Sequence, residues 1–577
     1  MRYHVLATDY DGTLAPYEKV TPDTIDYLKQ LKASGRKLIL VTGRQVQDLI
    51  ALFPEHILFD RIVAENGALM YSPATLEEKL LGVPPPDTFI NRLKELHVEP
   101  LDLGRVIVAT WQPNHIAVLD AIIEAGLEHQ VIFNKGAVMI LPPGVNKSTG
   151  LHEALKDLLL SEHNTVAIGD AENDHAMLHS AEVAVAVQNA LPTLKAEADM
   201  VTDSPSNIGV IEVIARLLQD DLAGLNSNLI RHNLHLGLNS DGTSFSISPY
   251  GNNILVAGSS CCGKSTFTSV FLEQLIAHHY QFCLLDPEGD YPDLPGVVTM
   301  GDDKQAPVIA EMMKVLHDSV QNVAICVLAI PFHERPAFFK KILISIADLY
   351  KRTGRPHFLV MDEAHHLLSS EHKEISIPPN NDLPDILAVT TEAKLIHKDL
   401  LSRLDTVITM GPTPYFAISA SRDVIGMTTE IPRDITLQKG EILVWSKKDN
   451  QLSFVKTVMP KNLLRRHKRK YASGNLGMDS FYFTGPGRKL NIQASNLMMF
   501  IQIANGIDLI TWLYHLHRND YSKWFRGSIK DEELAWRTEK VENTEPDGQL
   551  SRSWIVDLIL KRYTGPAEST SNHYALL

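Results

Sequence analysis

Short apolar runs alternate with helical patterns along most of this chain, in two successive series. The first series covers residues 1 to about 220 and contains the runs YHVLAT, KLILVT, RIVAEN, VIVATW and TVAIGD. The second lasts from about Leu234 to about Pro460, with the runs NNILVAG, QFCLLD, VAICVLAI, PHFLVMD, DILAVT and DTVITM. Strands that alternate with helices are typical of mostly parallel sheets. We therefore predict an α/β multidomain fold.

The end of the chain has a different pattern. A helix-rich segment runs from about Phe481 to Val541, followed by one amphipathic helix, SRSWIVDLILKRY, and a polar tail. We predict a small helical module at 475–545 and a helix with a tail at 546–577. Its tryptophans, Trp512, Trp524 and Trp536, are expected in the core of this module, because aromatic side chains bury a large apolar area.

Composition excludes several classes of protein. Apolar residues make up 44% of the 577 residues and charged residues 21%, which argues against disorder. Four cysteines cannot form a disulfide framework in so long a chain, and the start, MRYHVLATDYDG, lacks the apolar core of a signal peptide. The formal net charge of −15 argues against a generic polyanion binder. We expect a cytoplasmic protein with no membrane partner.

Polar motifs stand at the ends of several strands in the first series. HVLATDYDGTLA places Asp9 and Asp11 after the first strand, at the edge where open α/β sheets bind ligands. The later motifs are VTGR with Thr42, NKSTG with Lys147, and AIGDAENDHAM with Asp170, Asn173 and Asp174. In order and position these motifs resemble the four motifs of the haloacid dehalogenase-like phosphatases, over roughly the first 215 residues.

The resemblance implies a mechanism and a Rossmannoid core. Asp9 would be the nucleophile that forms an aspartyl-phosphate, and Asp11 would protonate the leaving oxygen and later activate water. Thr42 would bind the phosphoryl oxygens and Lys147 would offset charge. The implied Mg²⁺ site comprises Asp9, the backbone carbonyl of Asp11, and Asp170, supported by Asp174 through water or Lys147.

About a hundred residues separate Thr42 from Lys147, too many for a loop. We expect an α/β cap at about 76–143, between core segments 1–75 and 144–220. AENGALMY, around Asn66, and PPGVNKSTGL resemble the sugar-phosphate-hydrolysing branch of the family. A cap closes over small substrates, so we expect a small phosphorylated metabolite, such as a sugar or polyol phosphate. Arg44 is either a phosphate or substrate contact or a solvated arginine at a helix start.

The second series contains a complete P-loop pattern. NILVAGSSCCGKST is a strand followed by GxxxxGK[ST] and a helix, in which backbone N–H groups can surround the phosphates of ATP. The predicted nucleotide-binding residues are Gly258, Ser259, Ser260, Cys261, Cys262, Gly263, Lys264, Ser265 and Thr266. Lys264 should reach the β- and γ-phosphates, and Ser265 should ligate Mg²⁺. Cys261 and Cys262 are expected to contribute backbone amides only.

HFLVMDEAHH supplies a partner strand. Asp362 would bind Mg²⁺ through water, and Glu363 would polarise the attacking water, which indicates ATP hydrolysis. A hairpin before the P-loop, LLDPEGDY, and GEILVWSKKDNQLSFVKTV resemble the HerA and FtsK branch of RecA-like ring ATPases, over about 230–460. That resemblance implies a homo-oligomer, usually a hexamer, completed by a neighbour's arginine, for which Arg403 and Arg422 are candidates. Thr391 stands where the family usually has a glutamine sensor.

Three hypotheses for the whole chain remain open. The first joins a metabolite phosphatase to an ATP-hydrolysing ring that regulates or assembles it. The second is a DNA-translocating ring whose phosphatase part acts on nucleic acid ends or nucleotides; the basic run KNLLRRHKRK, residues 461–470, either meets nucleic acid phosphates or is a solvated linker. The third is a polynucleotide kinase–phosphatase, which Glu363 opposes because small kinases lack such a base.

Overall fold

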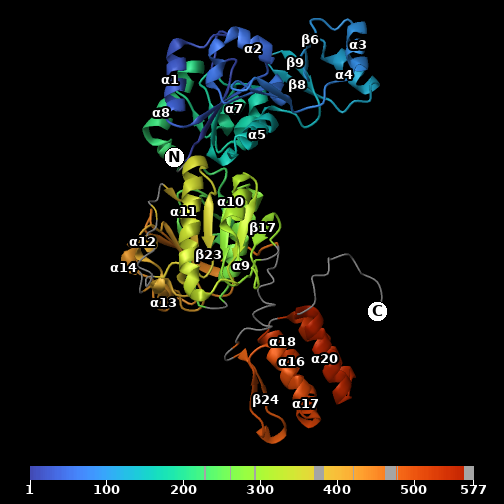
Figure 1. Ribbon diagram of the computed structural model, residues 1–577, viewed down its shortest axis with the longest axis vertical. Coiled ribbons are helices and arrows are strands. Elements are labelled where there is room, and N and C mark those ends of the chain that lie inside the picture. Colours follow the sequence, from blue (N-terminus) through green and yellow to red (C-terminus); the bar gives the residue numbers. More distant parts are fainter. Residues whose placement is uncertain are drawn as a thin grey trace. The chain divides into compact units, whose positions relative to one another are not determined.

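The structure is a computed structural model. It describes residues 1–134, 136–226, 229–259, 262–291, 294–369, 378, 382–419, 422–461, 476, 479–529 and 531–563. The chain divides into two compact units. One comprises Met1–Gly289 with Pro295–Lys461, and the other comprises Asp290–Leu294 with Asn462–Leu577. The first unit contains both predicted α/β series, which are drawn in blue to green and in green to orange in Figure 1.

The first α/β series forms an eight-stranded sheet within its described residues. In spatial order the strands are β12 (Met200–Val201), β11 (Val183–Ala186), β10 (Thr165–Gly169), β1 (Val5–Asp9), β2 (Lys37–Val41), β3 (Arg61–Ala64), β4 (Leu69–Ser72) and β5 (Glu77–Leu80). The strands from β12 to β3 are parallel, and β4 and β5 are added antiparallel. Every residue of β1 and β10 is buried, as expected for central strands covered on both faces. This confirms the predicted parallel α/β sheet.

Helices cover both faces of this sheet (Figure 1). They are α1 (Pro22–Ala33), α2 (Val46–Leu52), α5 (Lys147–Asp157), α6 (His175–Ser180), α7 (Pro192–Glu197) and α8 (Ser206–Asp220). α1 and α8 pack on each other, while α5 lies against β2, β3 and β4. Because α5 begins at Lys147, this packing brings the lysine to the carboxyl ends of the parallel strands.

A cap is inserted between β5 and α5. It consists of α3 (Asp87–Glu95), α4 (His115–Glu124) and an antiparallel sheet in the order β6 (Asp102–Leu103), β7 (Val108–Trp111), β9 (Ala137–Leu141) and β8 (Gln130–Asn134). Phe89, Leu93, Val118, Ile122 and Ile140 form its own small core. The cap therefore buries apolar side chains independently of the main sheet.

Glu65 ties the cap to the core. It lies just after β3, is 1% exposed, and has a φ of +52°. Its carboxylate accepts hydrogen bonds from the backbone amides of Arg105 (2.8 Å), Val106 (2.8 Å) and Ile107 (3.0 Å) in the cap. These charge-assisted bonds compensate the burial of the carboxylate and fix the cap's position.

The second α/β series forms an eleven-stranded sheet within the described residues. In spatial order it contains β14 (Ser244–Ile247), β13 (Leu234–Asn239), β23 (Gln451–Thr457), β22 (Glu441–Ser446), β21 (Thr406–Met410), β15 (Ile254–Gly258), β20 (Asp385–Thr390), β19 (Phe358–Met361), β16 (Phe282–Asp286), β18 (Asn322–Cys326) and β17 (Val297–Met300). The strands from β21 to β17 are parallel. The hairpin predicted before the P-loop is confirmed as β13 and β14.

The helices of the second series include α9 (Lys264–Ala277), α10 (Ile309–His317), α11 (Arg335–Thr353), α12 (Lys398–Leu401), α13 (Pro414–Ile418) and α14 (Arg422–Ile425). α9 follows β15 directly, as the P-loop pattern predicts, and its buried residues include Phe267, Phe271 and Leu275. The resulting strand–loop–helix unit holds Lys264 at the first position of the helix.

The second unit is mainly helical. It contains the short hairpin β24 (Phe481–Phe483) and β25 (Ile492–Ala494), then α16 (Leu497–Gly506), α17 (Leu509–Leu516), α18 (Asp520–Gly527), α19 (Glu532–Thr544) and α20 (Gly548–Tyr563). Trp512 and Trp524 are buried in its aromatic core. The prediction for Trp536 is wrong, because its side chain lies on the outer face of α19 beside the ammonium of Lys540, 3.8 Å from the ring centre, and is 53% exposed.

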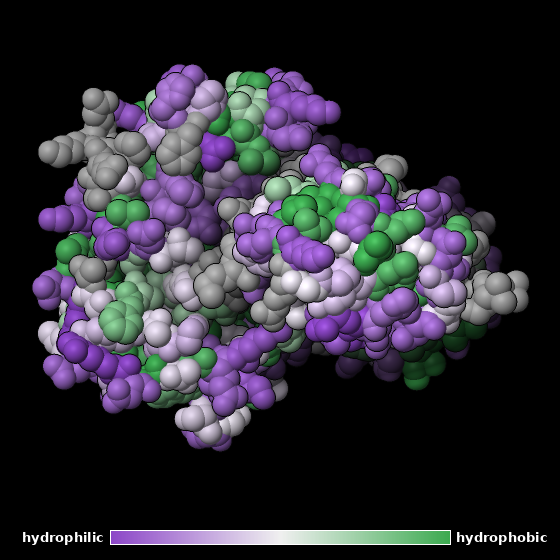
Figure 2. All heavy atoms as spheres, turned by 90° about the horizontal axis from the view of Figure 1, so that it is seen from below, coloured by the Kyte–Doolittle hydropathy of each residue, from purple (hydrophilic) through white to green (hydrophobic). Residues whose placement is uncertain are grey.

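Exposed apolar side chains form small patches between hydrophilic ones on the face that Figure 2 shows. Within the described residues, no helix combines the length and the apolar character that crossing a bilayer requires.

We expect Gly150→Ala to destabilise the first α/β series. A Cβ at Gly150, in α5, would lie 2.4 Å from Cγ1 of Val63 and 2.7 Å from Cα of Gly67, and backbone atoms cannot move aside cheaply. Overpacking of this kind costs about 1–3 kcal/mol and should lower the midpoint of thermal unfolding, measured by calorimetry, by several degrees. Gly224→Ala is the matched control, since a Cβ there meets nothing within 4 Å. Equal midpoints for the two variants would contradict the packing.

Candidate functional site

Three buried carboxylates and one ammonium meet at the carboxyl edge of the first sheet. Asp9 ends β1, and Asp170 and Asp174 follow β10; ligand atoms of the three lie within 4.8 Å of one another. The Nζ of Lys147 lies 2.5 Å from Oδ1 of Asp9 and 2.6 Å from Oδ1 of Asp174. Lys147 is 1% exposed and Asp174 is fully buried. The structure thus brings four of the sequence-predicted residues into direct contact.

Backbone and hydroxyl groups fix the orientation of these acids. The Oδ2 of Asp174 accepts hydrogen bonds from the backbone amides of Asp170 and Ala171, both at 2.9 Å. Thr13 donates its hydroxyl to Oδ1 of Asp170 at 3.3 Å. Thr13 was not among the predicted site residues, although it stands in the same DGTLA segment as Asp11.

Two asparagines join distant motifs beside the cluster. Asn173 donates from Nδ2 to Oδ1 of Asn66 at 2.9 Å, and both side chains are buried. Asn66 has a φ of +56° and its backbone amide donates to the carbonyl of Thr42 at 2.9 Å. The segment around Asn66 therefore connects the Thr42 motif to the motif that contains Asp170 and Asn173. All three segments were predicted from the sequence to belong to the site.

Arg44 contacts an acid of the site and not only solvent. Its Nε lies 2.8 Å from Oδ2 of Asp11, and its Nη2 lies 2.6 Å from Oδ1 of the same carboxylate. Glu18 accepts a further bond from Nη2 at 3.2 Å. The hydroxyl of Thr42 accepts a bond from the backbone amide of Arg44 at 3.1 Å. The role of Arg44 as a phosphate or substrate contact stays a prediction.

The cap lies over this edge of the sheet. Its strand β8 contacts the short helix η4 (Glu172–Asp174), which carries two site residues. On the other side, a Cβ built on Gly43, between Thr42 and Arg44, would lie 3.3 Å from Cε of Met139 in β9. The glycine thus permits the cap sheet to approach the Thr42 loop closely.

The P-loop lies at the carboxyl end of β15 in the second sheet. Gly258 ends the strand, and a Cβ there would lie 2.5 Å from the carbonyl of Met410. Gly263 has a φ of +107° and caps α9, so both glycines are required by geometry. Ser265 and Thr266 follow Lys264 in the first turn of α9, Cys262 is partly buried and Ser259 is exposed. Ser260 and Cys261 lie outside the described residues.

Lys264 is turned back onto its own loop. Its Nζ donates to the backbone carbonyls of Gly258 and Ser259, both at 3.0 Å, and the residue is 5% exposed. A buried ammonium needs such acceptors, and phosphate oxygens would satisfy it in the same way.

The predicted acidic pair follows β19. Asp362 and Glu363 are 1% and 7% exposed, and the backbone of Glu363 has a φ of +42°. His365 connects this pair to β20, because its Nδ1 lies 3.5 Å from Oε2 of Glu363 and 3.1 Å from the hydroxyl of Thr390. Thr390 is fully buried at the end of β20, between β15 and β19, whereas the predicted sensor Thr391 lies beyond the strand. The role of Thr391 as a sensor stays a prediction.

The two candidate arginines bind their own chain. Nη1 of Arg403 donates to the carbonyl of Pro378 at 2.5 Å, and Arg422 donates to the carbonyls of Met427 (3.2 Å) and Thr428 (2.9 Å). A role in a neighbouring subunit stays a prediction. The basic run lies outside the described residues except for Lys461.

Known proteins are similar to the part of the chain that carries the carboxylate cluster. A sequence profile of haloacid dehalogenase-like hydrolases matches residues 6–101 and 107–214. Phosphoglycolate phosphatase 2 of Saccharolobus solfataricus is 31% identical over 222 residues, which cover 92% of that protein and 37% of this chain. The phosphoglycolate phosphatase of Sulfurisphaera tokodaii is 40% identical over 231 residues, covering 95% of it and 37% of this chain. The chain belongs to the haloacid dehalogenase-like hydrolase family.

Solved structures cover a similar share of this chain. A haloacid dehalogenase-like hydrolase from Bacteroides thetaiotaomicron gives a TM-score of 0.33 at 20% identity, covering 37% of this chain and 99% of that one. A sugar phosphatase of subclass IIB gives a TM-score of 0.32 at 18% identity, covering 37% and 98%. The family assignment rests on the sequence relatives.

The electrostatics of the hydrolase site fit a divalent cation. Burial raises the pKa of Asp9 to about 8, the charges of Asp174 and Asp170 add to the rise, and Lys147 opposes it. Three buried carboxylates face one ammonium, so negative charge is left uncompensated. Oxygen ligands of this kind suit Mg²⁺, which the family implies, and a cation here would be held by Asp9, Asp170 and Asp174.

We expect the stability of the metal-free hydrolase to depend on Asp9. Because the folded-state pKa of about 8 lies above the ordinary value of 3.8, folding binds a proton. The stability that Asp9 contributes is complete below about pH 4 and is lost as the pH rises through about 8. Midpoints of thermal unfolding in a chelator should therefore fall more steeply with pH for the wild type than for Asp9→Asn.

Mg²⁺ gives the complementary test. It should raise the midpoint of the wild type more at pH 8 to 9 than at pH 5 to 6, because the cation competes with the proton for the same carboxylates. Parallel pH profiles for the wild type and Asp9→Asn, with no effect of Mg²⁺, would contradict this electrostatic description.

Proposed function

We propose that the N-terminal part of this hydrolase is a Mg²⁺-dependent phosphatase for a small phosphorylated metabolite. The observation that carries the proposal is the contact of one buried lysine, Lys147, with both Asp9 and Asp174 at the edge of the sheet. A lysine fixed between two carboxylates can neutralise a phosphoryl group that reaches the same place. The phosphoglycolate phosphatases among the relatives support the same reaction class.

In the proposed reaction a carboxylate oxygen of Asp9 attacks phosphorus, and the bond from phosphorus to the leaving oxygen breaks. Asp11 gives the leaving oxygen a proton. Water then attacks the phosphorus of the aspartyl-phosphate, Asp11 takes a proton from it, and inorganic phosphate leaves. Thr42 hydrogen-bonds the phosphoryl oxygens. A bound Mg²⁺ would offset the charge that nucleophile and phosphate bring together.

We favour phosphoglycolate over a sugar phosphate as the substrate. The sequence pattern favoured a sugar or polyol phosphate, whereas the relatives are named for phosphoglycolate. Arg44 provides a physical reason for an acid, since its guanidinium already binds the carboxylate of Asp11 in a two-pronged pair. A substrate carboxylate that takes over Arg44 would release Asp11 for proton transfer. The cap over the site excludes a polymer end.

We expect Asp9→Asn to abolish phosphate release while the fold survives, because the amide has the same shape but cannot act as the nucleophile. Loss of roughly 10³-fold or more in kcat is the scale of removing a nucleophile. Phosphate release should be measured on phosphoglycolate, sugar phosphates, nucleotides and phosphorylated DNA ends.

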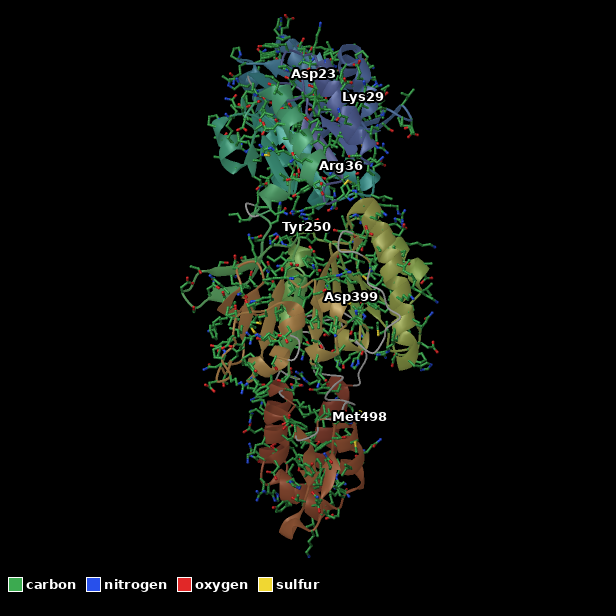
Figure 3. The ribbon with its side chains drawn as sticks, turned by 90° about the vertical axis from the view of Figure 1, so that its left-hand side faces the viewer. Asp23, Lys29, Arg36, Tyr250, Asp399 and Met498 are labelled. Atoms are coloured by element: carbon green, nitrogen blue, oxygen red, sulfur yellow. The ribbon has the colours of Figure 1, made fainter. Side chains whose placement is uncertain are left out.

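Asp23→Asn is the matched control, since it makes the same chemical change on an exposed residue of α1 (Figure 3). Wild-type turnover by Asp9→Asn would refute the role of Asp9. Preference for a sugar phosphate would refute the choice of phosphoglycolate while leaving the phosphatase in place.

We further propose that the second α/β part binds and hydrolyses ATP. The supporting observation is the buried Lys264 at the first turn of α9, at an edge of the sheet that also carries Asp362 and Glu363. The Nδ1 of His365 lies 3.5 Å from Oε2 of Glu363, and burial lowers the pKa of His365 to about 4, with smaller effects from neighbouring charges that include Lys264 and Asp362. In this proposal Lys264 binds the phosphates, Ser265 and Asp362 hold Mg²⁺, and Glu363 orients water.

Several finer expectations stay predictions. They are the RecA-like, HerA- or FtsK-type identity of the second part, the hexameric ring, the boundaries near residues 220, 230 and 460, and the cytoplasmic location. The nucleic-acid alternative also stays a prediction, because the basic run on which it depends is outside the described residues.

We expect Glu363→Gln to bind ATP but hydrolyse it far more slowly, since only the group that orients water is lost. Lys264→Ala should weaken ATP binding itself, because the buried ammonium is removed. Binding of a fluorescent ATP analogue and release of phosphate from ATP measure the two effects. Lys314→Ala, which removes an exposed lysine of α10, is the control. Equal hydrolysis by wild type and Glu363→Gln would remove Glu363 from the mechanism.

A further inference from the structure

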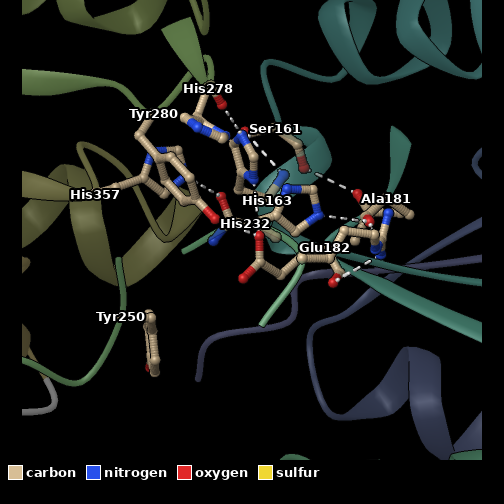
Figure 4. A network of polar contacts seen from close by, with 12 residues as sticks. Ser161, His163, Ala181, Glu182, His232, Tyr250, His278, Tyr280 and His357 are labelled. Carbon is tan, nitrogen blue, oxygen red and sulfur yellow. Dashed lines mark hydrogen bonds and ion pairs between the residues drawn. The ribbon is translucent and has the colours of Figure 1, made fainter. Parts of the chain in front are cut away.

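A buried polar network joins the two α/β parts of the first unit (Figure 4). Ligand atoms of His163, Glu182 and His232 lie within 4.8 Å of one another, a spacing that a metal ion could occupy. Glu182, however, is already paired with the guanidinium of Arg2. Its Oε2 also accepts bonds from the hydroxyl of Tyr280 (2.7 Å) and from Nδ1 of His163 (2.8 Å). The carboxylate is satisfied by protein donors, so the network is a structural junction.

His163 connects the two parts by hydrogen bonds from both of its ring nitrogens. Its Nδ1 faces the carboxylate of Glu182, and its Nε2 lies 2.7 Å from the backbone carbonyl of His278. The ring also stacks on Tyr280 of the second part at 3.6 Å and 18°. Because His163 is 5% exposed, this contact is held in place by packing on all sides.

The next residue, Asn164, makes a second connection. Its Nδ2 donates to the carbonyl of Gly354 at 3.4 Å. The Nδ1 of His357 accepts the backbone amide of Gln281 at 2.9 Å, so its Nε2 carries the hydrogen and donates to Oδ1 of Asn164 at 3.3 Å. Burial lowers the pKa of His357 well below its usual range, in agreement with a neutral ring. We call His163 and Asn164 the junction pair.

The elements that meet the junction pair lead to both candidate sites. α9 begins at Lys264 of the P-loop and is capped at its other end by His278. β19 begins directly after His357 and ends directly before Asp362. On the other side, the junction pair immediately precedes β10, which ends directly before Asp170. α9 has 14 residues and is about 21 Å long. β10 has five residues and is about 16 Å long.

Both sheets meet this junction with the amino ends of their strands. Arg36 of the first part and Tyr250 of the second lie at the ends of the parts that face one another (Figure 3), and the guanidinium of Arg2 lies 3.8 Å above the ring of Tyr250. Both candidate sites lie at the carboxyl ends of strands, so they face away from each other. The junction pair provides one continuous route between them, along α9 or β19, through His163 and Asn164, and along β10.

The first residue of α9 contacts the P-loop itself. The Nζ of Lys264 donates to the carbonyls of Gly258 and Ser259. Phosphate oxygens would take over its ammonium, so the first turn of the helix has two alternative sets of partners. Because a packed helix moves as a rigid element, a displacement of the first turn of α9 also displaces its C-terminal end. At that end the carbonyl of His278 lies 2.7 Å from Nε2 of His163.

We propose that a nucleoside triphosphate bound at the P-loop changes the activity of the hydrolase site through the junction pair. This inference rests on the proposed functions of both sites. In this proposal the activity of the hydrolase site depends on whether a nucleotide is bound to the second part of the same chain. The junction pair acts by position, since neither residue contacts a reacting atom.

The test measures kcat/KM for phosphoglycolate with the full chain and Mg²⁺, with and without a saturating, slowly hydrolysed ATP analogue. We expect the analogue to change kcat/KM of the wild type by about fivefold or more, the lower end of usual coupling between sites. In His163→Gln the change should fall below about twofold, while the activity without nucleotide stays within about twofold of wild type. His279→Asn is the matched control, because this exposed neighbour has a φ of +59°, which asparagine tolerates.

A reciprocal measurement needs no variant of the junction. In Asp9→Asn, which binds substrate without turnover, phosphoglycolate should change the dissociation constant of the ATP analogue, and the analogue should change the dissociation constant of phosphoglycolate by the same factor. This arm keeps the proposal testable even if His163→Gln fails to fold.

The outcomes separate the inference from the functions on which it rests. Failure of the analogue to bind the wild type would refute the ATP site, and absence of phosphate release would refute the phosphatase. Binding of the analogue with a change in kcat/KM below about fivefold would overturn the coupling and leave both functions standing. An undiminished change in His163→Gln would overturn the route through the junction pair.

Discussion

The hydrolase site depends on one buried ammonium. Lys147 is 1% exposed and contacts Asp9 and Asp174 at once, and neither acid could be buried at this density of negative charge without it. The packing of the surrounding elements positions Lys147 for this contact. α5 packs on β2, β3 and β4 so that its first residue reaches the ends of β1 and β10, and Gly150 allows the helix to approach β3 closely. The charge that remains uncompensated defines the place of a cation.

The cap completes the same site by a different physical means. Glu65, buried just after β3, accepts three backbone amides of the cap, while Gly43 gives the cap sheet room above the Thr42 loop. One carboxylate thus adds directional hydrogen bonds to the apolar contact that Val106, Ile107 and Leu141 of the cap make with Ala68 and Val145 of the core. A lid held by few directional bonds is suited to admit and release a small substrate.

The contact between the two α/β parts also depends on specific polar pairs. Their sheets meet at the amino ends of the strands, where His163, Glu182 and Arg2 are satisfied by partners from both parts (Figure 4). Buried charges that are paired and hydrogen-bonded tolerate little displacement, because each broken bond leaves an unsatisfied polar group in a dry environment. Such a junction makes one body of two folds whose reactive edges point away from each other.

The amino-acid sequence by itself determined the motifs and the strand pattern. Asp9, Thr42, Lys147 and Asp170, and the GxxxxGKS segment with Lys264, could be located from the sequence, because their chemistry requires those residue types at the ends of strands. The alternation of apolar runs likewise predicted two parallel sheets, since buried strands must be apolar on both faces.

Tertiary structure alone decided which residues became partners. Asn66 bonds to Asn173, 107 positions away, and His163 reaches the carbonyl of His278, 115 positions away. It also placed Thr390, and not Thr391, at the buried end of β20, and left Trp536 outside the helical core. Periodicity shows which face of an element is apolar but not which element covers it. A polar side chain's role depends on that covering partner, and the partner is fixed only when the whole chain has folded.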